Sequence, residues 1–156
     1  MLPKRTLSNF EKLPNDLLGD ILSRVAEISR TSLRNTMAAS PELAKVANDK
    51  RVNKKMNLNP LAMKPLQALN RYTQLMERCL QHRNTEVHYI KGIQEYFHRN
   101  NTNIGLHHLK SAAEGSYENG MYIYGIIMLC RGAEEEGKKY LEKLGWKQNK
   151  GKATQC

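Results

Sequence analysis

The sequence contains little cysteine, few aromatic residues and no long apolar run. Of its 156 residues, 3 are Cys, 1 is Trp and 6% are aromatic. The cysteines lie far apart and no two have the Cys-x-x-Cys spacing, so neither a disulfide framework nor a zinc ribbon is indicated. Cys79 and Cys130 fall within apolar helical stripes, where we expect both to pack in the core as small hydrophobic residues.

Signals for membrane insertion and secretion are also missing. The longest apolar stretch, from Met121 to Cys130, is too short to cross a bilayer as a helix, which takes about 20 residues. Lys4 and Arg5 are not followed by the apolar region of a secretory signal peptide. We therefore expect an intracellular protein, in the nucleus, the cytoplasm or both, with no membrane partner.

Motifs of catalysis and cofactor binding are absent as well. The sequence has no glycine-rich phosphate loop, no Ser/His/Asp or Cys/His signature and no His-Glu-x-x-His motif. His107 and His108 are adjacent, so on a helix they point about 100° apart and cannot bind one metal ion as residues four apart can. We predict no enzyme activity, no catalytic residues, no cofactor and no metal site.

Two basic clusters contribute to the net charge of +10. Clusters of this kind can bind nucleic acid, so a basic nucleic-acid-binding module is one alternative function. Neither cluster has the interleaved aromatic residues of an RNA-binding surface, and we favour solvated faces without a nucleic-acid partner. The first cluster is Lys45, Lys50, Arg51, Lys54 and Lys55, and the second is Lys138, Lys139, Lys143, Lys147, Lys150 and Lys152.

The apolar spacing predicts short helices and no strand. The first follows Leu13-Pro14, because Pro and an acidic residue are favoured in a first turn. The second runs from about Thr31 to Ala39, and the third starts with Ser40 as N-cap and Pro41 as its first residue. Beyond a break at 57–65, one longer helix should carry a single apolar face made of Leu69, Tyr72, Met76, Cys79 and Leu80.

The second half contains an internal repeat. Tyr89, Gly92 and Ile93 recur 33 residues later as Tyr122, Gly125 and Ile126, and Gly105 and Leu109 recur 32 residues later as Gly137 and Leu141. A period near 33 predicts stacked helical hairpins, and the recurring mid-helix glycines predict close approach of neighbouring helices. We predict a first domain over 10–56, a linker over 57–65, a repeat domain over 66–145 and a flexible basic tail over 146–156.

The first helical segment resembles the opening of the F-box family. It reads Leu13-Pro14-Asn15-Asp16-Leu17-Leu18-Gly19-Asp20-Ile21-Leu22-Ser23-Arg24-Val25, which matches the pattern L-P-x-D/E-L/I-L-x-x-I-L-x-R-L/V. The resemblance implies a three-helix module that docks on the Skp-type adaptor of a cullin–RING ubiquitin ligase. An apolar face larger than three short helices can bury agrees with such a partner site. Carried over by position, the adaptor-binding residues would be Leu13, Pro14, Leu17, Ile21, Leu22, Val25 and Leu33, with Asp16 capping or orienting the helix.

The end of the motif departs from the family. Where many members have S-K-x-W or S-K-x-F, this sequence has Ser40-Pro41-Glu42-Leu43, which keeps an apolar anchor but loses the aromatic ring. The departure leaves a second function open, a helical-repeat scaffold whose degenerate F-box no longer docks.

The second half resembles the Sel-like tetratricopeptide repeats. Leu109 to Ser116 and Tyr122 to Gly125 follow the patterns A-A-E-x-G and A-x-x-x-L-G, with Gly115 one place early and Tyr124 in the Leu place. The order of the two parts is similar to that of small plant F-box proteins. Together the resemblances imply an all-α substrate receptor of an SCF-type E3 ubiquitin ligase. Its partners would be a Skp-like adaptor, a cullin reached through that adaptor, and an unknown target protein.

Overall fold

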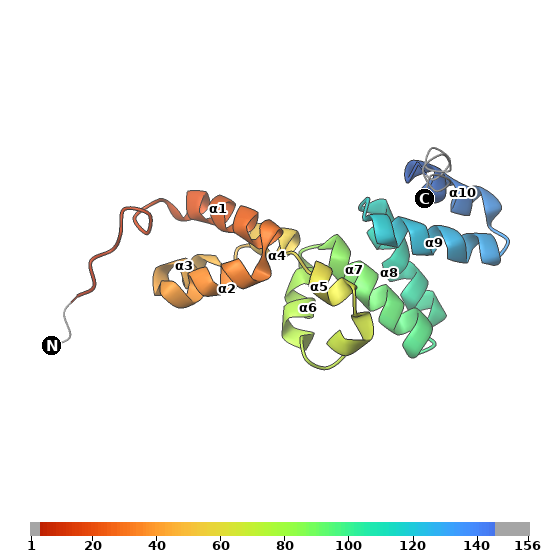
Figure 1. The fold of residues 1–156 in the computed structure, drawn as a ribbon, viewed down its shortest axis with the longest axis horizontal. Helices are drawn as coiled ribbons and strands as arrows, with labels where there is room; N and C mark the ends of the chain where they lie inside the picture. Colours follow the sequence, from red (N-terminus) through yellow and green to blue (C-terminus); the bar gives the residue numbers. More distant parts are fainter. Residues whose placement is uncertain (1–3, 146–156) are drawn as a thin grey trace, which may run out of the picture. The chain divides into compact units, whose positions relative to one another are not determined.

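A computed structural model describes residues 4–145 of the chain. Over that range the secondary structure is helical throughout, without strands, as the spacing predicts (Figure 1). The predicted basic tail, 146–156, lies outside the described residues. The helices are α1 (Asn15–Ile28), α2 (Arg30–Ala39), α3 (Pro41–Val46), α4 (Lys50–Lys55), α5 (Asn59–Ala62), η1 (Pro65–Ala68), α6 (Thr73–Gln81), α7 (Thr85–Ile93), η2 (Gln94–His98), α8 (Thr102–Glu114), α9 (Glu118–Cys130) and α10 (Glu134–Lys143).

The described residues form two compact units that interleave once along the chain. Unit 1 contains residues 4–58 and 74–84, and unit 2 contains 59–73 and 85–145. Helix α6 therefore belongs almost entirely to the same unit as α1–α4, although we placed it in the repeat domain, and the segment 57–65 holds the short helix α5. The functional boundaries that we predicted along the chain stay a prediction.

In unit 1, α1 packs against α4 and α2, and local signals set where the helices begin. Ser29 caps α2 by accepting a hydrogen bond from Ser32 N at 3.2 Å. Ser40 caps α3 by accepting one from Leu43 N at 3.3 Å, with Pro41 in the first turn, which confirms the predicted start. The core between these helices consists of Leu18, Leu22, Ala26, Leu33, Leu43, Ala47 and Val52.

Asn84, in the turn that follows α6, links this segment to the rest of unit 1. Met76 and Cys79 are buried, as expected for Cys79. The buried Asn84 donates through Nδ2 to the carbonyls of Asn53 at 3.1 Å and Met56 at 2.9 Å, and so satisfies acceptors at the end of α4. Helix α6 starts only at Thr73, so our longer helix including Leu69 was wrong. The turn of η1 and the bends that follow it interrupt the apolar period.

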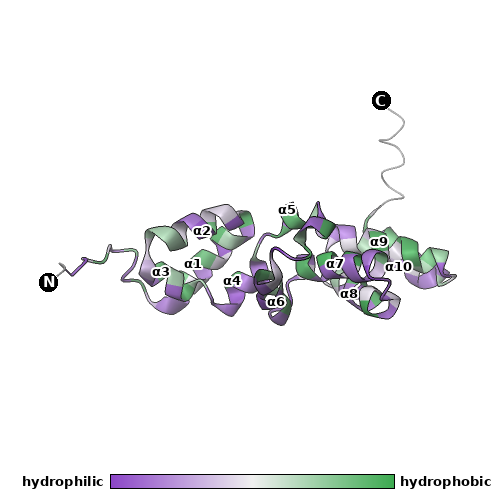
Figure 2. Cartoon of the chain, turned by 90° about the horizontal axis from the view of Figure 1, so that it is seen from below, coloured by the Kyte–Doolittle hydropathy of each residue, from purple (hydrophilic) through white to green (hydrophobic). Residues whose placement is uncertain are grey.

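In unit 2, four helices form two hairpins, α7–α8 and α9–α10. Helix α7 continues directly into the π-helix η2. The core gathers buried side chains of α8, α9 and α10, and Figure 2 shows hydrophobic colouring along α9. Its buried members are Leu109, Ala113, Met121, Tyr124, Ile127, Met128 and Tyr140.

The recurring glycines mark close approaches between helices, as predicted. A Cβ on Gly92 would lie 2.6 Å from Leu109 Cγ, and one on Gly125 would lie 2.9 Å from Leu141 Cγ. Both leucines also belong to the repeat. Glycine costs about 1 kcal/mol relative to alanine inside a helix, and the close contact offsets that cost. A Gly–Leu contact of the same kind therefore packs the two helices together within each hairpin.

Candidate functional site

The candidate docking site lies on one face of α1 and the two residues before it. Pro14 and Leu17 are exposed, Leu17 to 45%, whereas Leu13, Ile21 and Val25 are half-buried. Their spacing of three or four residues places them on one stripe of the helix. Ile28, 78% exposed, continues the stripe at its end. The predicted residues omitted Ile28, although its position three residues after Val25 could have revealed it.

Two of the predicted docking residues lie inside unit 1 instead. Leu22 is fully buried and Leu33 is only 2% exposed. Leu22 stands four residues after Leu18 and four before Ala26, on the face of α1 that turns toward the core. Neither side chain can reach a partner in this conformation, and we assign both to the core. Leu43, at the place of the missing aromatic ring, is buried as well.

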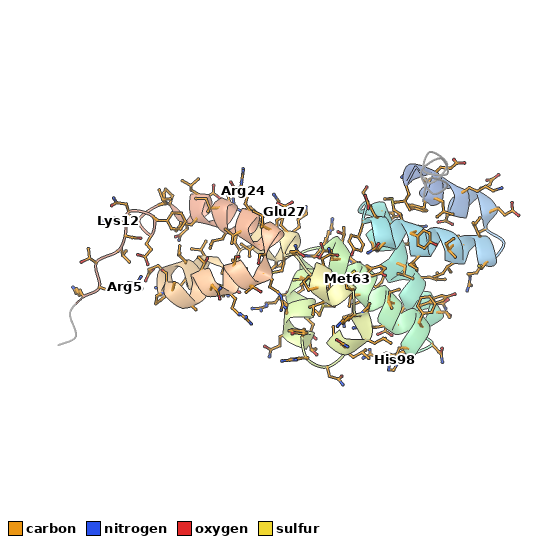
Figure 3. All side chains as sticks on the ribbon, viewed as in Figure 1. Arg5, Lys12, Arg24, Glu27, Met63 and His98 are labelled. Atoms are coloured by element: carbon orange, nitrogen blue, oxygen red, sulfur yellow. The ribbon has the colours of Figure 1, made fainter. Side chains whose placement is uncertain are left out.

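A clasp centred on Glu11 holds the chain in front of α1. We define the Glu11 clasp as Arg5, Ser8, Glu11 and Ser40. The Glu11 carboxylate accepts from Arg5 Nη2 at 2.9 Å and from Ser8 N at 2.8 Å, and the Ser40 hydroxyl donates to it as well. Ser8 Oγ accepts from Glu11 N at 3.3 Å, which completes a reciprocal capping box around one turn. Figure 3 labels Arg5 and Lys12 in this segment before α1.

The hydrogen bonds of the clasp keep Glu11 ionised. The hydrogen bond from Ser40, followed by those from Ser8, lowers the pKa of Glu11 from 4.5 to about 2. The side chain of Glu11 is almost fully buried, so its charge depends on these donors. Because Ser40 also caps α3, the clasp joins the residues before Leu13 to the start of α3. Sequence reasoning missed the clasp. Ser8-x-x-Glu11 is the sequence signature of a capping box and could have indicated the turn, but it does not indicate the contact with Ser40.

A second polar cluster joins the start of α1 to α4. Arg51 lies between the Asp49 carboxylate, 3.0 Å away, and Asp16, whose Oδ1 lies 3.1 Å away and whose carbonyl accepts at 3.0 Å. The hydrogen bonds from Arg51 hold the pKa of Asp49 below its usual value, and Asp49 in turn raises that of Arg51. A Cβ on Gly19 would collide with Arg51 Nη2. Asp16 thus orients α1 through Arg51, and Gly19 leaves the space for the guanidinium group.

Comparison with known proteins finds a repeat family over part of the chain and F-box proteins among its relatives. The family model described as plant tetratrico peptide repeats matches residues 59–156. An F-box protein of Arabidopsis thaliana is 39% identical over 143 residues, which are 92% of this chain and 87% of that protein. The chain belongs to the plant F-box protein family.

A second relative of this F-box protein, from the same plant, is named a putative F-box protein. It is 29% identical over 131 residues, which are 84% of this chain but 44% of that relative. No solved structure matches the chain significantly. The repeat family model begins at Asn59, the residue at which α5 begins.

Two of the five histidines of this F-box protein form a pair between α7 and α8. His88 Nδ1 and His108 Nδ1 are 3.0 Å apart, so one ring must donate to the other. Burial, followed by the charge of His88, lowers the pKa of His108 to about 4. Burial also lowers the pKa of His88. In residues 4–145, no group of three or more His, Cys, Asp or Glu side chains could hold a metal ion.

Two further expectations concern the burial of Cys130 and membrane insertion. Cys130 is exposed at the end of α9, so our prediction that it packs in the core was wrong, because its position follows the exposed stripe of Tyr122 and Ile126. No helix within the described range 4–145 is both long and apolar enough to cross a membrane.

Proposed function

We propose that this protein is a substrate receptor of an SCF-type E3 ubiquitin ligase. In this proposal the stripe of Leu13, Pro14, Leu17, Ile21, Val25 and Ile28 docks a Skp-like adaptor, and a cullin joins through that adaptor. The observation that carries the proposal is the exposure of an apolar stripe on α1 directly after the Leu-Pro start of the F-box motif. Exposed apolar stripes of this kind mark partner surfaces, and helix-in-groove contacts read such stripes at three- and four-residue spacing.

The polar clusters support the proposal because they hold the stripe in place before a partner arrives. The Glu11 clasp fixes the chain in front of Leu13, and Arg51 fixes the first turn of α1. A preorganised surface binds more tightly, since less conformational entropy is lost on docking. A stable interface needs about 800 Å² from each partner. The stripe would supply its central anchors.

The helical repeat would present the target protein, and ubiquitin transfer would take place on other subunits. We expect no catalytic activity, cofactor or metal in this chain, and action in the nucleus, the cytoplasm or both. A receptor of this kind needs a second surface besides the docking module, and the hairpins of unit 2 would supply it.

The proposal is tested by adaptor binding of three variants of the full chain. Leu17→Ala removes an exposed anchor, and the double change of Leu13 and Pro14 to Ala removes the start of the stripe. Truncating a central anchor costs more than about 1 kcal/mol, so we expect at least about fivefold weaker binding by calorimetry. Ile104→Ala is the matched control, because Ile104 is 53% exposed on α8 of unit 2.

Two outcomes would contradict the proposal. Wild-type chain that is folded and binds no Skp-type adaptor would select the scaffold with a degenerate F-box. Equal affinity of the Leu17→Ala and Ile104→Ala variants would remove α1 from the interface.

The basic nucleic-acid-binding alternative predicts a log affinity that falls by about 0.7 to 0.9 per neutralised phosphate for each tenfold rise in salt. A flat salt response or no binding would remove that alternative.

A further inference from the structure

Residues 4–8 are exposed, have an irregular backbone and contain an arginine at a spacing that some Ser/Thr kinases recognise. All five are exposed and none lies in a helix. Arg5 stands three residues before Ser8, the spacing at which basic-directed Ser/Thr kinases read an arginine. Such enzymes select their substrates by charge pattern and bind them as extended peptides. The segment can adopt that shape without unfolding any helix.

The same two residues build the Glu11 clasp. Arg5 contributes its ion pair with Glu11, and Ser8 contributes both halves of the capping box through its backbone N and its Oγ. The Glu11 carboxylate accepts the bonds from Arg5 and from Ser8 N, and a pKa of about 2 keeps it ionised throughout the physiological range. Any negative charge added at Ser8 would therefore arrive beside an existing one.

We propose that Ser8 is a phosphorylation site for an arginine-directed kinase, and that its phosphate opens the Glu11 clasp and weakens docking by α1. The last step rests on the proposed function. In the reaction Ser8 Oγ attacks the γ-phosphorus of ATP and forms the new P–O bond. The bond to the oxygen that bridges the β- and γ-phosphates breaks and ADP leaves, while the hydroxyl proton passes to the catalytic base of the kinase.

The effect on the clasp follows from charge. A phosphoserine carries about −1.5 to −2 charges and three strong acceptor oxygens. Those oxygens compete with Glu11 for Arg5, the clasp residue with a positive charge, and they repel the carboxylate that Ser8 N now contacts at 2.8 Å. The Glu11 side chain then moves away from the Ser40 hydroxyl, because the same carboxylate accepts from Ser8 N and from Ser40. The chain in front of Leu13 loses its link to α3.

The chain contains an internal control with the same spacing. Arg99 also stands three residues before a hydroxyl, that of Thr102, but there the backbone is held. Arg99 pairs with Glu95 at 2.7 Å, Asn101 donates to Glu95 at 2.7 Å, and Thr102 begins α8. Asn100 between them has a φ of 57°, so the segment is not extended. We expect the kinase to leave Thr102 unmodified in the folded chain.

The site is tested by treating the full chain with ATP and the catalytic subunit of the cyclic-AMP-dependent protein kinase. We expect mass spectrometry to find one phosphate, on Ser8. Ser8→Ala should abolish incorporation and Thr102→Ala should leave it unchanged. Arg5→Ala should slow the initial rate about tenfold, which corresponds to about 1.4 kcal/mol of recognition. No incorporation, or incorporation elsewhere, overturns the proposal.

Two further measurements separate the clasp from the docking function. Amide hydrogen exchange over residues 8–13 and at Leu43 N should rise in the phosphorylated chain, and unchanged exchange overturns the opening of the clasp. Adaptor affinity should fall about tenfold on phosphorylation, and an equal affinity overturns the regulatory step. If the unmodified chain binds no adaptor, the proposed function fails, whereas incorporation and exchange still decide the fate of the Ser8 site.

Discussion

Gly105→Ala is the sharpest test of the repeat packing. A Cβ at Gly105 would lie 2.6 Å from Tyr96 N, 2.6 Å from Tyr96 Cβ and 2.7 Å from Tyr96 Cα. These are backbone and near-backbone atoms, so no side-chain rotation can relieve the collision, and α8 must move away from η2. Overpacking of this kind costs about 1–3 kcal/mol, and we take the upper end because the obstacle is rigid.

The helix propensity of alanine acts in the opposite direction. Replacing Gly with Ala inside a helix gains about 1 kcal/mol, which leaves a net loss of about 2 kcal/mol. With a urea dependence of about 2 kcal/mol per molar, the unfolding midpoint should fall by about 1 M. Circular dichroism at increasing urea concentration measures this shift.

The matched control for Gly105→Ala is Asn103→Ala, an exposed position two residues earlier on α8. It should be neutral or slightly stabilising, because Ala is the better helix former and nothing collides. If Gly105→Ala were as stable as the wild type or more so, the close contact between α8 and η2 would be refuted. The parallel contact between Gly137 and the Gly125 carbonyl would then lose its support as well.

Two further predictions concern pH. Because the folded-state pKa of Glu11, about 2, lies below the unfolded value of 4.5, its contribution to stability is complete above pH 4.5 and disappears as the pH falls toward 2. Glu11→Gln should therefore weaken the acid dependence of the unfolding free energy in this window, and an unchanged slope would contradict the clasp. The folded-state pKa of His108, about 4, lies below the unfolded 6.5, so the unfolded chain binds the proton first and stability falls as the pH drops from 6.5 to 4. His108→Gln should reduce that fall, as measured by urea unfolding at pH 7 and pH 5, with the exposed His98→Gln as control. Equal pH dependence in all three proteins would rule out the buried pair.

Features set by neighbouring residues could be predicted from the sequence. The start of α3 needs only Ser40, Pro41 and the amide of Leu43, all within four residues, and the structure has it as predicted. The same holds for the absence of strands over residues 4–145, because apolar spacing reports the helix period directly. The predicted helix through Leu69 and Tyr72 failed because spacing alone does not register a turn such as η1.

The sequence could not predict which apolar residues of a helix face the core. On α1, Leu17, Leu18, Ile21 and Leu22 are equally apolar, and the positions of α2 and α4 decide that Leu18 and Leu22 are buried. The F-box resemblance supplied residues but not their orientation, so Leu22 was placed at the surface. The Glu11 clasp was missed for a related reason. Its partner Ser40 is 29 residues away, and nothing in the local pattern indicates that contact.

Burial could not be predicted in the repeat either, because equivalent positions of its two copies differ in exposure. Tyr89 and Ile93 are half-buried and pack against the core of unit 2, and the ring of Tyr89 lies 5.3 Å from that of Tyr117. Their counterparts Tyr122 and Ile126 are 54% and 37% exposed. The first hairpin is followed by α9, whereas within residues 4–145 no further helix follows α10. Burial at a repeated position therefore depends on the next repeat in the stack rather than on the motif itself. A sequence pattern that treats both pairs alike can find the hairpins and their Gly–Leu contacts, but it cannot tell which pair remains at the surface.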